Sequence, residues 1–235
     1  MGKELVSQTA RVRARRVFDE AGWSPAIFAL GLVISILMVA RSQVTVDQYN
    51  LLARGWRLAV EGELVPHGVW ATGGGQHPGI LTSLAVGLPL LLWLDFRAPI
   101  LLILATHVCA FLLLGRVLRP ALGSRERVIF AALYWLSPWR LFYSGFLWNP
   151  NLLFVCGALH LATVRGLRDR PRFWTSVWHV VVLGGAMQFH ASAILLVAAT
   201  GLLWWRRLIR LHLGGAMVGV AGVCRANVPL CPLAG

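Results

Sequence analysis

Long apolar runs alternate with short polar segments along most of this chain. The first run covers residues 23–40, and the later runs leave only a few polar residues between them. Some runs are shorter than the ~20 residues that a membrane-crossing helix prefers. Their number and spacing nevertheless predict an all-α fold, a polytopic transmembrane helical bundle. After the first span, we expect crossings at residues 98–115, 128–146, 150–164, 174–187, 191–205 and 208–224.

Residues 41–97 interrupt this pattern with a long loop of mixed polarity. Within the loop, residues 46–61 have the periodicity of an amphipathic helix. Thr45 and Gln48 have the spacing of a capping box at the start of this helix. Because an amphipathic helix beside a span usually lies in the interface plane, we expect a juxtamembrane helix here. Its predicted apolar face holds Leu52, Trp56, Ala59 and Val60, and its polar face holds Asp47, Asn50, Arg54, Arg57 and Glu61.

The rest of the loop contains a glycine-rich stretch and a further apolar run. Residues 73–79 have too many glycines for regular secondary structure and predict a flexible turn rather than a phosphate-binding loop. Residues 79–94 are apolar, but the run is short and contains Pro89. If this run crossed the membrane, every later basic cluster would change sides. We therefore predict that it enters the membrane or its interface without crossing.

Basic residues cluster between the apolar runs and set the expected orientation. Lys and Arg near span ends stay on the cytoplasmic side of a membrane. The N-terminus and three arginine clusters hold 16 of the 22 basic residues, so we place them in the cytoplasm. Residues 41–97, 137–151 and 188–190 then share the outer face. The clusters are Arg116/Arg119/Arg125/Arg127, Arg165/Arg168/Arg170/Arg172 and Arg206/Arg207/Arg210.

Composition supports this interpretation, because 57% of the residues are hydrophobic and only 13% are charged. The net charge of +13 would suggest nucleic acid in a soluble chain. Here the orientation bias accounts for it, and we expect no nucleic-acid partner. Nucleotide-binding, hydrolase and zinc-protease motifs are absent from the sequence. The four cysteines lack metal-binding spacing and are typical of small buried residues: Cys109, Cys156, Cys224 and Cys231.

These patterns divide the chain into three parts. Residues 1–22 are a basic cytoplasmic N-terminus, and residues 23–224 are the transmembrane module with its outer loop at 41–97. The first span has no small-residue cleavage site before Arg41, so we expect it to be retained. Residues 225–235 are a short tail that we expect to be a truncated end.

Asp47 is the leading candidate for chemistry on the outer face. It lies just past the first span, on the polar side of the expected juxtamembrane helix. A carboxylate in this position can take a proton from a hydroxyl group or hold a divalent cation. Alternatively, it is a solvated acid stabilised by the helix dipole. His67 and His77 lie in the same loop, and His77 directly precedes the apolar run at 79–94.

The segment 137–151 is the second candidate region. Its two prolines interrupt helix on both sides, and Trp139, Tyr143 and Trp148 suggest an aromatic belt. Arg140 is the one basic residue in this segment. It either reaches membrane headgroups or pairs with a lipid phosphate. Asn149 follows Trp148 and completes the polar part of the segment.

The third candidate region is the pair Gln188 and His190. Residues 174–205 are too long for one span and have basic flanks on both sides, so two helices must meet near this pair. Polar groups at such a depth either make a packing hydrogen bond or face a polar cavity.

In order and spacing, these features resemble the N-terminal part of the C-type integral-membrane glycosyltransferases. Protein O-mannosyltransferase and lipid A aminoarabinose transferase relatives belong to this superfamily. The resemblance rests on the outer Asp47 with its helix, His77-Pro78-Gly79, the inner turn 116–125, and the outer segment 137–151 followed by Gln188-Phe189-His190. It covers about residues 23–205.

The resemblance implies transfer of a sugar from a polyprenyl-phosphate donor to an acceptor on the outer face, with inversion. Asp47 would be the catalytic base or the ligand of a divalent cation. Substrate contacts would come from His77, Arg140, Trp148, Asn149, Gln188 and His190. The expected location is the bacterial inner membrane, with membrane lipids as further partners.

The chain departs from the superfamily pattern at two places. Gln48 stands where many relatives carry a second acid, and Asn149 or Asn151 stands where many carry an acid in the second outer loop. Relatives are also much longer, which is why we expect a fragment. The alternative function is a non-catalytic membrane protein, either a carrier of lipid-linked sugars or a scaffold subunit.

Overall fold

The computed structural model describes residues 24–70, 76–78 and 80–227. Apart from one short hairpin, the regular structure in these ranges is helical, which confirms the all-α prediction. The helices that follow the outer loop are α5 (Arg97–Leu118), α6 (Ser124–Trp135), α7 (Pro138–Tyr143), η2 (Asn149–Leu152), α8 (Leu153–Leu167), α9 (Phe173–Phe189), η3 (Ala191–Ala193), α10 (Ile194–Trp205) and α11 (Leu213–Asn227). They are preceded by α2 (Ser24–Ala40), α3 (Val46–Trp56), η1 (Arg57–Glu61) and α4 (Leu81–Leu92).

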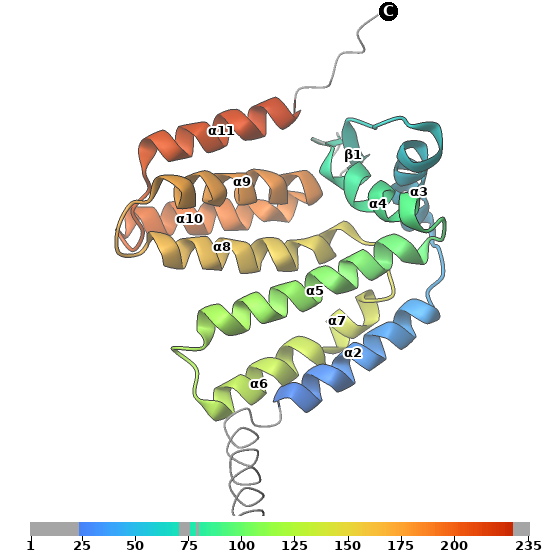
Figure 1. Ribbon diagram of the computed structural model, residues 1–235, viewed down its shortest axis with the longest axis horizontal. Coiled ribbons are helices and arrows are strands. Elements are labelled where there is room, and N and C mark those ends of the chain that lie inside the picture. Colours follow the sequence, from blue (N-terminus) through green and yellow to red (C-terminus); the bar gives the residue numbers. More distant parts are fainter. Residues whose placement is uncertain (1–23, 71–75, 79, 228–235) are drawn as a thin grey trace, which may run out of the picture.

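The longer helices lie side by side and form a layered bundle (Figure 1). Helix α2 packs on α6, α5 packs on α8, and α8 packs on α9, which in turn contacts α11. The connections α5–α6, α8–α9 and α10–α11 all lie at the left end of the view in Figure 1. Helices α3 and α4 and the hairpin lie at the right end. The three arginine clusters are therefore at one end of the bundle, and α3, α4 and the hairpin are at the other.

Two helices in the described residues are long and apolar enough to cross a membrane, residues 97–118 and 149–167. Four shorter apolar helices accompany them, at residues 24–40, 81–92, 191–205 and 213–225. The 12 residues of α4 rise about 18 Å at 1.5 Å per residue, well short of a ~30 Å hydrocarbon core.

The run at 128–146, predicted as one crossing, is not one continuous helix, because the chain breaks into α6 and α7. Pro138 lacks the N–H that would continue the hydrogen-bond ladder, and it forces Ser137 into an extended conformation, with φ −56° and ψ 122°. The last span also begins later than predicted, at Leu213, and continues past residue 224 to Asn227.

The glycine-rich stretch was predicted to lack regular structure, and this is wrong at its end. Gln76–Pro78 forms strand β2, which pairs antiparallel with β1 (His67–Trp70). His67 is opposite Pro78, and Trp70 is opposite Gln76. The connection, residues 71–75, lies outside the described residues.

Helix α3 occupies the predicted position but is rotated from the predicted orientation. Leu51 is 4% exposed, whereas Trp56 and Val60 are about half exposed. The close approach of α4 causes this rotation, because a Cβ on Gly55 would lie only 2.4 Å from Val86 Cγ1. The helix continues through η1 and ends at Gly62, whose φ of 70° suits a residue without a side chain.

A second close crossing joins α2 to α6. A Cβ on Gly31 would lie 2.6 Å from Trp135 Cβ and 2.9 Å from the Trp135 carbonyl oxygen. Small residues at such crossings let helix backbones approach closely. Beside this contact, the aromatic rings of Phe28, Phe111 and Trp135 pack against one another in the core.

Candidate functional site

Gln48 joins helix α3 to the segment 137–151. Its side chain is 2% exposed, and its amide oxygen accepts a hydrogen bond from Leu147 N at 3.2 Å. Its amide nitrogen donates to Gln43 O and to Thr45 Oγ1. The predicted capping box is therefore wrong: Thr45 is the N-cap residue but makes no side-chain cap. Gln48 instead satisfies a buried backbone N–H from a distant segment.

Gln188 has a packing role at the same end of the bundle. It is 3% exposed, and its side-chain oxygen accepts from Leu81 N at the start of α4, at 3.3 Å. Its carbonyl oxygen accepts from Thr82 Oγ1 at 3.3 Å. The sequence left two interpretations open for Gln188, a packing hydrogen bond or contact with a polar cavity. The structure shows packing hydrogen bonds. His190 Nδ1 accepts from Ser192 N at 3.2 Å and so caps the turn η3.

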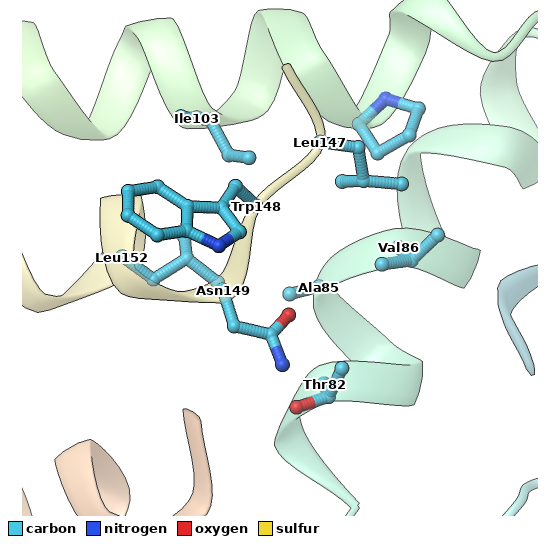
Figure 2. A pocket seen from close by; sticks show the side chains of 9 residues that line it. Thr82, Ala85, Val86, Ile103, Leu147, Trp148, Asn149 and Leu152 are labelled. Carbon is cyan, nitrogen blue, oxygen red and sulfur yellow. The ribbon is translucent and has the colours of Figure 1, made fainter. Parts of the chain in front are cut away.

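Trp148 and Asn149 line a small cavity between η2, α4 and α5 (Figure 2). The cavity has a volume of about 10 Å³, which is about enough for one water molecule. Asn149 is 6% exposed, and Figure 2 shows its amide pointing toward Ala85 and Thr82 of α4. A space of this size cannot hold a sugar.

The three aromatic residues predicted to form a belt in this segment lie in contact as one cluster of rings. Tyr143 stacks on Trp148 with ring centroids 4.2 Å apart. Trp139 lies 4.6 Å from Tyr143 and 6.4 Å from Trp148, centroid to centroid. Asn151 holds the turn below the rings by donating to the carbonyl oxygens of Tyr143 and Phe146. The proline-bounded segment is thus a compact aromatic corner.

Arg140 does not join the other candidate residues. It is 3% exposed, and its Nη2 donates to Ser35 Oγ and to the Trp135 carbonyl oxygen, both at 2.9 Å. Its guanidinium carbon lies 4.4 Å from the Trp135 ring centroid. Pairing with a lipid phosphate stays a prediction, but the prediction that Arg140 reaches membrane headgroups is wrong, because the Arg140 side chain is buried. It points into the bundle because the α6–α7 break directs it back over Trp135.

The remaining candidates can be placed only by their backbone. Asp47 is the second residue of α3, and His77 is the middle residue of β2. Their side chains lie outside the described residues. His67 is exposed, and its carbonyl oxygen accepts from Arg54 Nη1 at 2.6 Å. Partial burial, together with the nearby Arg57 charge, lowers the pKa of Arg54.

An open groove of about 590 Å³ runs between α3 and the ends of α4 and α5. Its wall is mostly apolar, and Arg57 and Glu61 lie at its edge. Arg57 is within 3.6 Å of Glu61 and also pairs with Glu63. The apolar lining residues are Val44, Leu52, Ala53, Trp56, Leu90, Leu94 and Phe96, with Tyr49 beside them. This groove lies along the helix that carries Asp47.

The sequence predictions missed a buried polar network between α8, α9 and α10. His160 Nε2 and His179 Nε2 both contact Thr200 Oγ1, at 2.8 and 3.0 Å. His179 Nδ1 contacts Thr163 Oγ1 at 2.8 Å, and that hydroxyl donates to the His160 carbonyl oxygen. The sequence signal for this network was the presence of histidines inside apolar runs. Their hydrogen-bond partners, however, lie on other helices.

The proton positions in this network follow from its donors. Because the Thr163 hydroxyl proton is used by the His160 carbonyl, His179 must carry its proton on Nδ1. His179 Nε2 then accepts from Thr200 Oγ1, which in turn accepts from His160 Nε2–H. His179 is neutral in this arrangement, because its Nε2 accepts and carries no proton. Thr200 therefore links three helices through one hydroxyl group.

The described residues do not form a metal site. Among them, no group of three or more His, Cys, Asp or Glu side chains comes together. The His, Cys, Asp and Glu side chains among the described residues therefore do not supply a set of ligands for a divalent cation.

Comparison with protein-family models, with curated proteins and with solved structures gave no match to this chain.

Proposed function

We propose that this chain is a multi-pass protein of the bacterial inner membrane that transfers a sugar from a polyprenyl-phosphate donor. Transfer takes place on the outer face. The observation that carries the proposal is the polarity of the bundle. All three arginine clusters connect helices at one end, whereas α3, with Asp47, lies with α4 at the other (Figure 1). This arrangement is what the positive-inside rule and an outer juxtamembrane helix require together.

The orientation can be measured by labelling single cysteines with a membrane-impermeant thiol reagent. In a background without native cysteines, probes at Asn50, Phe96 and Ala191 should react from outside, because these residues lie at the α3 end. Probes at Ala121 and Pro171 should react only after the membrane is permeabilised. Outside labelling at Ala121 would refute the orientation. Opposite labelling of Gln76 and Phe96 would show that α4 crosses.

The groove beside α3 is the proposed place for the donor lipid. It is open, mostly apolar and about 590 Å³ in volume, which suits an isoprenoid chain better than a free sugar. The donor phosphate then lies at the outer end of the bundle, near the start of α3. The compensated charge of Arg57 limits its use as a phosphate ligand, because two acids already pair with it.

Asp47 is the proposed general base. An acceptor hydroxyl oxygen forms a bond to the anomeric carbon of the sugar, and the bond from that carbon to the phosphate oxygen breaks. The hydroxyl proton passes to Asp47, and polyprenyl phosphate leaves with the bonding electron pair. Attack from the face opposite the phosphate inverts the anomeric centre. A base near the acceptor hydroxyl is what this reaction needs most.

Filling the groove tests its role in donor binding. Ala53 lines the groove, so Ala53→Trp should displace part of the lipid chain. Each buried methylene contributes about 0.8 kcal/mol, and losing contact with two of them lowers affinity about tenfold. Binding of a polyprenyl-phosphate sugar to the purified protein measures the effect. Asn50→Trp adds the same ring at an exposed position of α3 outside the groove and should bind normally; equal affinity in both variants would exclude the groove.

One observation favours the second candidate, a non-catalytic carrier or scaffold that binds lipid-linked sugar. Asn149 lines a cavity too small for a sugar, and Asn151 is used to hold the aromatic corner. Neither offers an acid at the position where the resemblance expects one. Donor binding that depends on the groove, with no transfer to any acceptor, would establish this second function.

A further inference from the structure

Two arginine clusters that are distant in sequence become one surface in the folded chain. The backbone N–H of Arg210 donates to the Leu167 carbonyl oxygen at 2.9 Å, which joins the α10–α11 connection to the end of α8. His212 N donates to Ser176 Oγ at 2.9 Å, which joins the same connection to α9. Ile209, in the α10–α11 connection, is 1% exposed and so anchors this connection in the protein interior. We define the arginine surface as Arg168, Arg170, Arg172, Arg206, Arg207 and Arg210.

The arginine surface carries a large excess of positive charge. All six side chains are exposed, and among the described residues none of them makes a salt bridge. Asp169 is the one acid within these two connections. Arg207 has a φ of 58°, so this non-glycine residue is held in the left-handed region by its surroundings. The charges are thus concentrated on a turn whose backbone is fixed.

Exposed tryptophans lie next to these arginines. Trp174 and Trp178 in the first turns of α9 are 68% and 60% exposed, and Trp204 and Trp205 at the end of α10 are 57% and 75% exposed. The Arg206 guanidinium lies 5.7 Å from the Trp205 ring centroid. Tryptophan prefers the level of the lipid headgroups. These rings therefore place the arginine surface at the depth of the phosphates.

We propose that the arginine surface is a binding site for anionic phospholipid headgroups of the cytoplasmic leaflet. Clusters of several basic residues at the cytoplasmic ends of helices bind anionic lipids, and guanidinium groups suit phosphodiesters because they donate parallel hydrogen bonds. The tryptophans contact the glycerol and the upper acyl chains. This inference rests on the membrane placement proposed above, but it is independent of sugar transfer.

The chain offers a matched control at the same end of the bundle. Arg116, Arg119 and Arg125 are also exposed, but they lie in and around the α5–α6 connection, where residues 116–127 include Glu126 and no tryptophan. If net charge alone attracted lipid, removing these three arginines would have the same effect as removing three from the arginine surface.

The test compares lipid preference in three variants of the full chain reconstituted in mixed vesicles. Quenching of tryptophan fluorescence by brominated phosphatidylglycerol and by brominated phosphatidylcholine gives the relative affinity for the two lipids. Since each basic residue near the surface changes binding about fivefold, Arg206→Gln/Arg207→Gln/Arg210→Gln should lower the preference for phosphatidylglycerol by at least about tenfold. Arg168→Gln/Arg170→Gln/Arg172→Gln should do the same, because both connections build the site.

Arg116→Gln/Arg119→Gln/Arg125→Gln should retain the preference. An equal loss in this control, or no loss in either of the other two variants, would overturn the proposal. Reversal of the preference by millimolar inorganic phosphate would also overturn it, since the site would then bind soluble anions. Circular dichroism and elution volume show whether each variant is folded. Failure of this test leaves sugar transfer and the labelling pattern unaffected, so the two proposals can fail separately.

Discussion

Replacing Asp47 with Asn should abolish sugar transfer while leaving the amount of folded protein in the membrane unchanged. The amide keeps the shape of the carboxylate but cannot accept the acceptor's proton. General-base assistance typically accounts for about 10²–10⁴ in rate, so we expect transfer to fall at least about 100-fold. Transfer of labelled sugar from a polyprenyl-phosphate donor to acceptor measures it. Donor binding should persist, because the groove is built by other residues of α3, by the end of α4 and by the connection that follows it.

Glu63→Gln is the matched control for this experiment, because Glu63 is not among the residues that line the groove. This acid follows the same helix and pairs with the exposed Arg57. Exposed ion pairs contribute little to stability, so the control should transfer sugar normally. Full activity in the Asp47→Asn variant would remove its catalytic role. Loss of activity in both variants would show instead that the outer loop requires negative charge in general.

Replacing Thr200 with Val should destabilise the bundle more than the loss of a single buried methyl group does. The change keeps the shape of the side chain but removes the hydroxyl that contacts His160 Nε2 and His179 Nε2. Two buried imidazole nitrogens then lose their partner. Leaving one buried polar group unsatisfied costs about 1–3 kcal/mol, although hydrogen bonds between helices in membranes are often weaker. We expect a loss of about 2 kcal/mol, measured by reversible unfolding in mixed micelles.

Thr200→Ser provides the control, since serine retains the hydroxyl and loses only a methyl group. It should recover most of the lost stability. Equal destabilisation by both variants would mean that packing of the methyl group, and not the hydrogen-bond network, holds α8, α9 and α10 together. Nitrogen chemical shifts of the two histidines give a separate check, because they distinguish the proposed tautomers.

The sequence predicted the positions of most helices but not the continuity of all of them. Apolar runs located α2, α5, α8, α9 and α10 to within a few residues, because an isolated helix needs mainly a continuous stretch without breakers. Pro138 was recognised as a helix breaker, but the apolar run across it was still taken as one crossing. The helix breaks there because Pro138 restricts the backbone of Ser137 to a non-helical conformation.

The candidate site was harder to predict, because side-chain direction depends on distant contacts. Trp139, Tyr143 and Trp148 come together because they lie on one short segment bounded by prolines. Arg140 lies in the same segment yet turns inward to Trp135 and Ser35. Nothing in the local sequence gives this direction, because Ser35 belongs to another helix.

By itself, the sequence determined the helical character of this protein, the amphipathic helix after the first span, and the separation of basic connections from polar ones. These three features depend on residues that are close together in the sequence. Only the tertiary structure decided which face of α3 is buried, because Val86 approaches Gly55 from α4. It also joined two arginine clusters into one surface and linked two histidines through Thr200. Such contacts depend on helix rotation and crossing, which are set by the packing of residues far apart in sequence.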